Sequence, residues 1–344
     1  MSGKKILIVG PAWVGDMVMA QSLFKAIMQQ NTLSLIDVLA PPWTKPLLER
    51  MPEVRNAHVM PIGHGSIQLK KRYEIAQQLK SHHYDQAIVL PNSWKSALIP
   101  WFAHIPIRTG FCGEFRFGLL NDIRLLDKKR LPQMVQRFVA LAYPALSKKE
   151  KIKEPILLPK LEIKEAALGG TKQKFSISLN PSVPILALCP GAEFGPSKQW
   201  PSDYFATVAL AKIKSGFSVW LFGSKNDVEI SNDIQAKTNH QCVNFTGKTS
   251  LEEAIDLLSL TTLVLTNDSG LMHIAAALGK PIVALYGSTD PSFTPPLTEN
   301  VRIERLSLPC SPCFKRVCPL EHHRCMRDLS PDRIIKEIDN QCVF

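Results

Sequence analysis

The sequence predicts an α/β protein built from two doubly wound, Rossmann-like domains that face a cleft. In each half, short apolar runs alternate with segments of helical periodicity, which is the pattern of parallel strands and their crossover helices. A segment rich in Lys, Pro and Gly, Ser147–Ser182, separates the two series and predicts a linker. The chain of 344 residues is also long for one hydrophobic core. We therefore expect an N-terminal domain over residues 1–175 and a C-terminal domain over residues 176–344.

The first half begins with the pattern of a strand, a turn and a helix. Lys5–Val9 is a short apolar run, a turn containing Gly10 and Gly15 follows, and Met17–Gln29 has helical periodicity. The G-x-G-x-x-G fingerprint of dinucleotide-binding enzymes is absent, so a nicotinamide dehydrogenase is disfavoured. The further elements expected in this half are the strands Leu35–Ala40 and Gln86–Leu90 and the helices Lys70–Ser81 and Lys95–Phe102.

Asp16 stands just after the first predicted strand, near the amino-terminal end of the first helix. A carboxylate at this position can cap the helix. It also lies where open α/β sheets bind ligands, in the crevice beyond the carboxyl ends of the strands. There it could act as a general base.

The second half repeats the alternation of strands and helices, with polar or glycine-bearing loops after the strands. The strands expected here are Ile185–Cys189, Val219–Phe222, Leu263–Leu265 and Ile282–Tyr286. The helices expected here are Asp203–Ser215, Leu251–Leu260, a helix opened by Ser269-Gly270 that runs through Leu278, and Asp332–Ile338.

The turn between the third of these strands and its helix is the most informative stretch. Asn267 and Asp268 end the strand, Ser269 and Gly270 open the helix, and His273 lies one turn into it. A helix N-terminus beyond a strand's carboxyl end favours an anion, most simply a phosphate. The alternative is an ordinary βαβ unit in which Asp268 or Ser269 caps the helix.

The net charge of +11 is unevenly spread along the chain. Residues 1–175 contain 26 Lys and Arg against 13 Asp and Glu, whereas residues 176–344 contain 15 against 17. The basic half is expected to meet nucleic acid, an anionic membrane surface or an acidic substrate, unless its charge serves only solubility. Arg108–Gly118, read as a loop, interleaves arginines with aromatics and glycines, which suits stacking on bases or binding of an anionic sugar or phosphate.

No run of about 18 apolar residues is present, so the sequence predicts no membrane-spanning helix. The apolar run after Lys4-Lys5 is too short for a signal peptide, and eight cysteines without such a signal indicate a reducing, cytoplasmic location. Four of the cysteines lie near His322 and His323, with spacing that partly resembles metal ligands; they are Cys310, Cys313, Cys318 and Cys325. The alternative is buried or free thiols in a surface loop.

Three segments together resemble a known family, the lipopolysaccharide heptosyltransferases of the GT-B class. They are K-I-L-I-V-G-P-A-W-V-G-D-M at the start, C-P-G-A-E-F-G-P-S-K-Q-W-P from Cys189, and N-D-S-G-L-M-H-I-A-A-A-L-G-K-P from Asn267. The resemblance covers nearly the whole chain. Ser288–Pro291 and the cysteine-containing segment C-F-K-R-V-C-P-L-E-H-H-R-C-M favour the enzymes that add the second heptose.

The resemblance implies inverting transfer of heptose from ADP-heptose to the first heptose of the acidic Kdo-lipid A inner core. It implies no cofactor and no metal. Such a displacement needs a base for the acceptor hydroxyl and a cation or dipole for the leaving diphosphate. On this basis Asp16 is expected to be the base, and Lys198 is expected to pair with the diphosphate unless it is only a surface lysine.

The resemblance also assigns the donor and acceptor residues. Asp268, Ser269, Gly270 and His273 are expected to shape the phosphate and sugar subsite, although His273 could merely pack within its helix. Asp227 aligns with the ribose-binding position, and Lys248 and Thr249 are expected near the adenine. The candidates for binding the acceptor's phosphates and carboxylates are Lys70, Lys71, Arg72, Lys95, Arg108 and Arg116.

Two other functions are kept open. One is heptosyltransferase I, or another GT-B enzyme acting on an activated sugar. The other is a non-catalytic nucleotide- or RNA-binding protein that uses the basic half. The main interpretation predicts no nucleic-acid partner, but it allows peripheral contact with the inner membrane at its cytoplasmic face, because the acceptor is a lipid.

Overall fold

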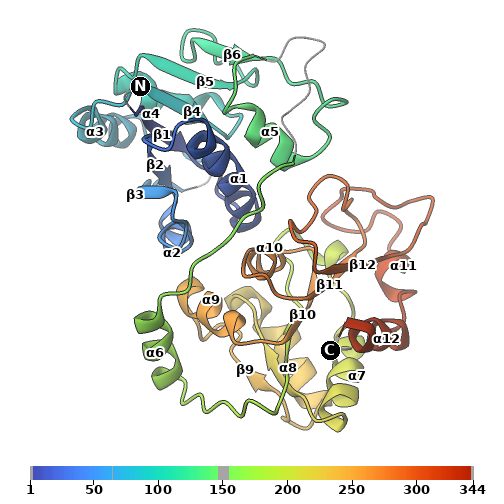
Figure 1. The fold of residues 1–344 in the computed structure, drawn as a ribbon. Helices are drawn as coiled ribbons and strands as arrows, with labels where there is room; N and C mark the ends of the chain where they lie inside the picture. Colours follow the sequence, from blue (N-terminus) through green and yellow to red (C-terminus); the bar gives the residue numbers. More distant parts are fainter. Residues whose placement is uncertain (1–2, 64, 146–154, 342–344) are drawn as a thin grey trace. The chain divides into compact units, whose positions relative to one another are not determined.

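The computed structural model describes residues 3–63, 65–145 and 155–341, and the chain divides into two compact units, Met1–Pro159 and Lys160–Phe344. Each unit contains a parallel sheet with helices along it, as the sequence predicts (Figure 1). The division falls 16 residues before the expected boundary at 175/176. The reason is α6 (Glu165–Lys174), a helix inside the predicted linker that packs against α9 (Leu251–Ser259) of the second unit. Residues 147–154 of that linker lie outside the described residues.

The first unit has a sheet in the order β3-β2-β1-β4-β5-β6, and all its strand pairs are parallel. The strands are β1 (Lys5–Val9), β2 (Leu35–Ala40), β3 (Val54–Val59), β4 (Gln86–Val89), β5 (Ile107–Phe111) and β6 (Asp122–Arg124). Chain order runs outward from β1 in one direction and then from β4 in the other. The topological switch point, where open α/β sheets bind ligands, therefore lies between β1 and β4.

The helices of the first unit are α1 (Val14–Gln30), α2 (Lys45–Leu48), α3 (Leu69–Lys80), α4 (Leu98–Phe102) and α5 (Met134–Ala140), with 3-10 turns η1 (Pro42–Thr44) and η2 (Trp94–Ala97). Helix α1 is buried along most of its length and packs against α5. The sequence correctly predicted β1 and β2, but the predicted loop at Arg108–Gly118 is wrong at its start, because residues 107–111 form β5.

The second unit has a sheet in the order β12-β11-β10-β7-β8-β9, again with parallel pairs. The strands are β7 (Ile185–Cys189), β8 (Ser218–Leu221), β9 (Val243–Asn244), β10 (Leu263–Asn267), β11 (Ile282–Tyr286) and β12 (Val301–Arg305). Strands β7, β10 and β11 are buried at every residue, which explains the apolar sequences of β7 and β11 and the apolar start of β10. Here the switch point lies between β7 and β10.

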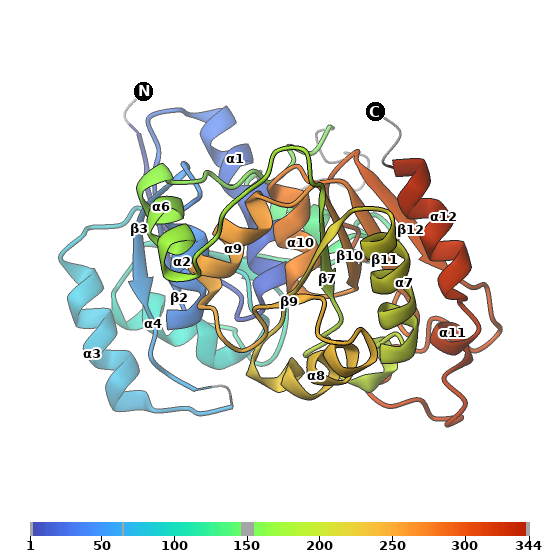
Figure 2. The same ribbon diagram turned by 90° about the horizontal axis from the view of Figure 1, so that it is seen from below.

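Besides α6 and α9, the second unit contains α7 (Ser202–Lys214), α8 (Val228–Lys237), α10 (Gly270–Ala277), α11 (Arg324–Arg327) and α12 (Pro331–Gln341), with 3-10 turns η3 (Pro196–Lys198) and η4 (Lys225–Asp227). Helix α12 packs beside α7 (Figure 2). None of the helices in the described part of the chain has both the length and the apolar character needed to span a bilayer.

Trp200 anchors the long loop that follows β7. Its ring is fully buried against Phe205, and its indole nitrogen donates a hydrogen bond to the carbonyl of Leu329 at 2.9 Å. The loop's two ends are joined by Asn267, whose side chain donates to the carbonyl of Pro190 at 2.7 Å and accepts from the backbone nitrogen of Trp200 at 3.2 Å. Residues 190–200 are therefore held as a closed loop at the switch point.

Candidate active site

Polar side chains follow five neighbouring strands of the second unit at their carboxyl ends. Across the sheet from β11 to β9 they are Thr289, Asp268, Lys198, Asp227 and Lys248. The carboxyl ends of parallel strands lie at one edge of a sheet, so these residues form a row along that edge. An extended anionic ligand with several polar groups would suit such a row.

Lys198 and Asp268 form a close ion pair at the switch point. The Lys198 ammonium donates to Asp268 Oδ2 at 2.6 Å, and the two side chains are only 13% and 5% exposed. The ammonium also lies 4.9 Å from the centre of the Phe194 ring. The alternative that Lys198 is an ordinary surface lysine is therefore wrong.

Residues that the sequence analysis did not single out complete this centre. Thr289 donates its hydroxyl to the same Asp268 oxygen at 2.6 Å. A hydrogen bond of 2.9 Å joins the hydroxyls of Ser197 and Ser288, so the residues immediately before Lys198 and Thr289 are also joined. The sequence signals for these partners were the segment from Cys189, which contains Ser197, and the Ser288–Pro291 motif, but neither gave these hydroxyl groups a role.

The amino-terminal end of α10 lies beside this ion pair. Ser269 is the N-cap residue, but its side chain makes no capping hydrogen bond, and Gly270 is the first helical residue. The first N–H groups of a helix have no partner within the helix and carry partial positive charge. The end of α10 therefore offers N–H donors to an anion next to the Lys198 ammonium.

His273 lies inside the first turns of α10 and is 5% exposed. Burial lowers its pKa to about 4, and the nearby charges of Asp268 and Lys198 act in opposite directions on it. The imidazole is therefore neutral near pH 7. It can offer a hydrogen bond at this site but no positive charge.

Asp227 follows β8 and lies directly over the loop that follows β7. Its Oδ2 accepts hydrogen bonds from the backbone nitrogen and the hydroxyl of Ser224, both at 2.8 Å. A Cβ on Gly191 would lie 2.3 Å from Asp227 Oδ1, so glycine is required there for the carboxylate to hold its position. Asp227 is thus placed one strand away from Lys198, on the side of β8.

Lys248 and Thr249 lie in the loop between β9 and α9, at the far end of the row. Lys248 is exposed, and its ammonium donates to the carbonyl of Asn244 at 2.9 Å. Thr249 is half-buried. They belong to the same edge of the sheet as Lys198, but two strands away from it.

In the first unit, Asp16 is the third residue of α1, so it is not the N-cap residue, which is Trp13. It is half-buried and follows β1, beside the switch point. The turn that carries it is fixed by the indole nitrogen of Trp43, which donates to the carbonyl of Ala12 at 2.9 Å. The carboxyl end of a strand beside the switch point is where open α/β sheets bind ligands.

The three predicted acceptor-binding arginines direct their guanidinium groups at the protein's own backbone. Arg72, 4% exposed, donates to the carbonyls of Ile67 and Lys95 at 2.6 and 3.0 Å. Arg116, 2% exposed, donates to the carbonyls of Pro91 and Phe111. Arg108 donates to the carbonyls of Leu119 and Ile105, both at 2.6 Å. These arginines hold loops in place, and burial lowers the pKa of each.

The three predicted lysines are placed differently. Lys70 is exposed and Lys71 is half-buried on α3, and Lys95 is half-buried in η2, just beyond the carboxyl end of β4. Arg72 joins these two segments, because it lies on α3 and donates to the carbonyl of Lys95. The basic composition of the sequence predicted this cationic region. It could not show that the three arginines bind the protein's own carbonyls whereas the three lysines are placed differently.

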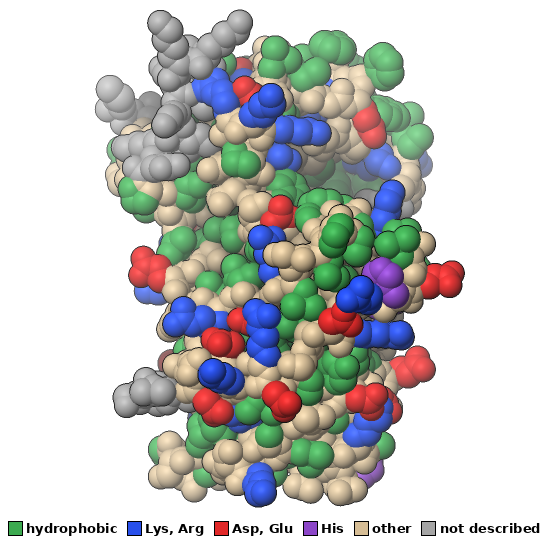
Figure 3. Space-filling model, turned by 90° about the vertical axis from the view of Figure 1, so that its right-hand side faces the viewer, with side chains coloured by type: hydrophobic (Ala, Val, Ile, Leu, Met, Phe, Trp, Pro, Cys, Tyr) green, Lys and Arg blue, Asp and Glu red, His purple; other side chains and the backbone are tan. Residues whose placement is uncertain are grey.

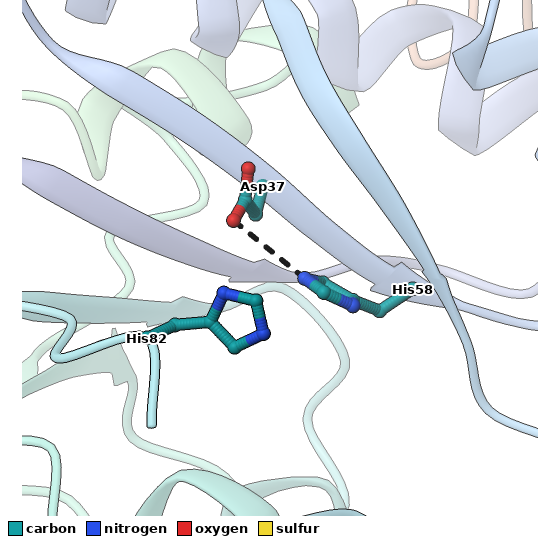
Figure 4. Close-up of side chains that lie close together, drawn as sticks. All are labelled: Asp37, His58 and His82. Atoms are coloured by element: carbon teal, nitrogen blue, oxygen red, sulfur yellow. Dashed lines mark ion pairs between the residues drawn. The ribbon is translucent and has the colours of Figure 1, made fainter. Parts of the chain in front are cut away.

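A separate cluster contains Asp37 of β2, His58 of β3 and His82 of the turn between α3 and β4 (Figure 4). Their ligand atoms lie within 4.8 Å of one another, a spacing that could hold a metal. However, Arg55 binds the fully buried Asp37 carboxylate with two hydrogen bonds of 2.9 and 2.6 Å, and Tyr84 donates to it at 2.6 Å. The carboxylate is already neutralised, so the cluster is a structural network.

Comparisons with known proteins agree with this arrangement. Residues 72–324 match glycosyltransferase family 9 (heptosyltransferase). The lipopolysaccharide heptosyltransferase 2 of Escherichia coli K12 is 45% identical over 341 residues, covering 97% of each chain. The lipooligosaccharide heptosyltransferase 2 of Haemophilus ducreyi is 46% identical over 344 residues, covering 97% of this chain and 98% of the relative.

A solved structure is similar over the same length. That of E. coli ADP-heptose LPS heptosyltransferase II matches with a TM-score of 0.86 and 43% identity, covering 98% of each chain. The two parallel-sheet units therefore have the GT-B fold that the sequence predicted.

The Asp37 network should make the stability of the fold depend on pH. Burial opposes ionisation of Asp37, but hydrogen bonds from His58, Arg55 and Tyr84 outweigh it and hold its pKa below the ordinary range. Because the folded pKa lies below the unfolded value, the stabilisation is present above about pH 5 and declines as the pH falls through about 4. Asp37→Asn should lower the free energy of unfolding by about 2 kcal/mol or more at pH 7, and by less at pH 3.

Urea unfolding followed by circular dichroism at pH 7, 5, 4 and 3 measures this difference. Asp85→Asn, at an exposed position of the same unit, is the control for removing one carboxylate. A wild-type-to-variant difference that stays constant from pH 7 to pH 3 would show that the Asp37 charge does not stabilise the fold.

Proposed function

Because the chain belongs to glycosyltransferase family 9, the heptosyltransferases, we propose that it is a heptosyltransferase II, which moves heptose from ADP-heptose to the first heptose of the Kdo-lipid A inner core. The observation that carries this substrate assignment is the 45% identity to lipopolysaccharide heptosyltransferase 2 over 97% of both chains. The row of polar residues in the second unit supports a nucleotide-sugar donor.

In this proposal the donor lies along the row from β10 to β9. The diphosphate is bound by the Lys198 ammonium and by the N–H groups at Ser269 and Gly270. An ammonium has three N–H donors, so Lys198 can keep its hydrogen bond to Asp268 while it binds a phosphate oxygen. Neutral His273 completes the phosphate and sugar subsite as a hydrogen-bonding group.

The nucleoside extends toward β8 and β9. The two ribose hydroxyls donate to Asp227, whose carboxylate is fixed by Ser224 and fits over Gly191. The adenine lies near Lys248 and Thr249, two strands from the diphosphate site. The order of the residues along the sheet edge thus follows the order of the chemical groups in ADP-heptose.

Transfer requires a base and a stabilised leaving group. Asp16 removes the proton of the acceptor hydroxyl as its oxygen attacks the anomeric carbon of heptose. The bond from that carbon to the diphosphate breaks on the opposite face, so the configuration inverts. The negative charge that develops on ADP is stabilised by Lys198 and the end of α10, and the chemical step needs no metal.

The acceptor is assigned to the first unit. Lys70, Lys71 and Lys95 contact its phosphates and carboxylates, while Arg72, Arg108 and Arg116 hold the loops that carry this surface. Because the acceptor is a lipid, we also propose peripheral contact of these lysines with the anionic cytoplasmic face of the inner membrane.

The direct test uses ADP-heptose and two purified acceptors, Kdo-lipid A with and without its first heptose, with products identified by mass spectrometry. We expect one heptose to be added only to the acceptor that already bears one. Addition to the bare acceptor would instead indicate heptosyltransferase I. If heptose is added to neither acceptor, the substrate assignment is wrong, whereas the description of the fold still holds.

Replacing the proposed base, Asp16, should stop turnover without weakening the binding of the donor nucleotide. Asp16→Asn keeps the size of the side chain but cannot accept the proton, so kcat should fall by about 10²–10⁴-fold. ADP binding, measured by calorimetry, should stay near the wild-type value because the proposed donor residues belong to the second unit. Asp85→Asn is again the control, and near-normal kcat in Asp16→Asn would exclude Asp16 as the base.

Replacing Lys198 should affect both kcat and the affinity for ADP. Lys198→Ala removes the cation at the diphosphate, so kcat should fall by about 10²–10³-fold and ADP should bind more weakly. Lys214→Ala, at an exposed position on α7, is the matched control. Circular dichroism checks that the buried Asp268 is tolerated without its partner. Wild-type values of both parameters would place Lys198 outside the site.

A further inference from the structure

The segment between β12 and α11, residues 306–323, is folded without a core of its own. It contains no helix or strand and buries no apolar side chain, and Phe314, Val317 and Leu320 are 50–62% exposed. It runs along the right-hand side of Figure 1 as an irregular loop. Figure 3 faces that side of the molecule, where charged and hydrophobic side chains are interspersed.

The side chains of this segment that turn inward include its cysteines. Cys310, Cys313 and Cys318 are half-buried within a mostly exposed segment, and Cys325 of α11 is half-buried next to it. A short irregular segment without apolar burial usually needs covalent or metal cross-links to hold one conformation. Inward-facing thiols are the groups that can supply them.

The segment meets Cys325 at the end of β11. Ser311, which lies between Cys310 and Cys313, donates its hydroxyl to the carbonyl of Gly287 at 2.6 Å. The Cys325 sulfur is also close to the end of β11, since a Cβ on Gly287 would lie 3.2 Å from it. Cys310 and Cys313 are therefore held near the same residue, Gly287, as the Cys325 sulfur.

We propose that Cys310, Cys313, Cys318 and Cys325 bind one tetrahedral metal ion, zinc or iron, that fixes this segment to the second unit. All-thiolate tetrahedral sites select these metals, and the Cys-x-x-Cys spacing at 310–313 is that of structural zinc sites. The site is separate from the residues assigned to the transfer reaction.

Binding requires the sulfurs to move together. Metal–sulfur distances are about 2.3 Å in such sites. Among the described residues, the one group of three His, Cys, Asp or Glu whose ligand atoms lie within 4.8 Å of one another is the Asp37 network. The four sulfurs therefore stand farther apart than in a closed site, and side-chain rotations in this irregular segment bring them to the ion.

The segment is bonded to the two loops that carry the donor site. The backbone nitrogen of Phe314 donates to the carbonyl of Ser288 at 2.7 Å. Ser197 donates its backbone nitrogen to the carbonyl of Arg316 at 3.1 Å and its hydroxyl to the carbonyl of Lys315 at 2.5 Å. Ser197 and Ser288 precede Lys198 and Thr289, so a metal that orders residues 310–325 also supports the Lys198–Asp268 centre.

Metal analysis of the full chain, purified without chelator, tests the proposal. Inductively coupled plasma mass spectrometry should find about one zinc or iron per chain, and either metal supports the proposal. Titration of the wild-type chain with p-mercuribenzoate should release that metal into a chromogenic chelator as the four thiols react. This measurement does not depend on any variant being able to fold.

Variants identify the ligands. Cys313→Ser should lose most of the metal, whereas Cys112→Ser, at an exposed position in the first unit, should keep it. Cobalt substituted into the wild-type chain should show the spectrum of a tetrahedral thiolate site. A chain without metal, disulfides among the four cysteines, or full metal content in Cys313→Ser would each overturn the proposal.

The link to the donor site rests on the proposed function and is measured separately. Removing the metal should raise the KM for ADP-heptose more than it lowers kcat, because it loosens the loops that hold Lys198 and Thr289. Unchanged kinetics with the metal removed would confine the site to a structural role, and the metal content would still stand on its own.

Discussion

The Lys198–Asp268 ion pair is the interaction on which the second unit's site depends. Two charges that are nearly excluded from water are costly unless each is compensated. Asp268 is compensated by Lys198 and Thr289, which come from the loops after β7 and β11, while Asp268 itself follows β10. One carboxylate thus fixes three loops from three adjacent strands. The neighbouring Asn267 closes the first of these loops at its base.

This arrangement explains why the loop after β7 combines glycine with rigid anchors. Trp200 fixes its carboxyl end in the core, and Gly191 lets Asp227 approach its amino end. Between them, Lys198 is held by its ion pair and by the Phe194 ring. The loop is therefore mostly irregular in structure but strongly constrained in position. The Lys198 ammonium is held in place in advance, so in the proposed function it can bind a phosphate without a large loss of conformational entropy.

The sequence was a good guide to the interior strands and the longer helices and a poor guide to the edge strands. Strands β1, β2, β7 and β11 were predicted at their observed bounds, because a parallel strand inside a sheet is covered on both faces and reads as a mostly apolar run. The four edge strands, β3, β6, β9 and β12, were all missed, because no such run is required at an edge, and β5, next to an edge, was predicted as part of a loop. Asp268 was found from the turn after its strand and Lys198 from the family resemblance, whereas the carbonyl partners of Arg72 and Arg116 depend on chain folding that no local pattern encodes.

The composition of the outer strands has a consequence for how the protein behaves at high concentration. An edge strand exposes unpaired N–H and C=O groups that can recruit a strand from another molecule. Here β9 has two residues and β6 has three, while β3 and β12 contain Arg55, Arg302 and Arg305. Very short or charged edges are poor templates for strand addition. The same polar character that hides these strands from sequence analysis therefore protects both sheets from growing into aggregates.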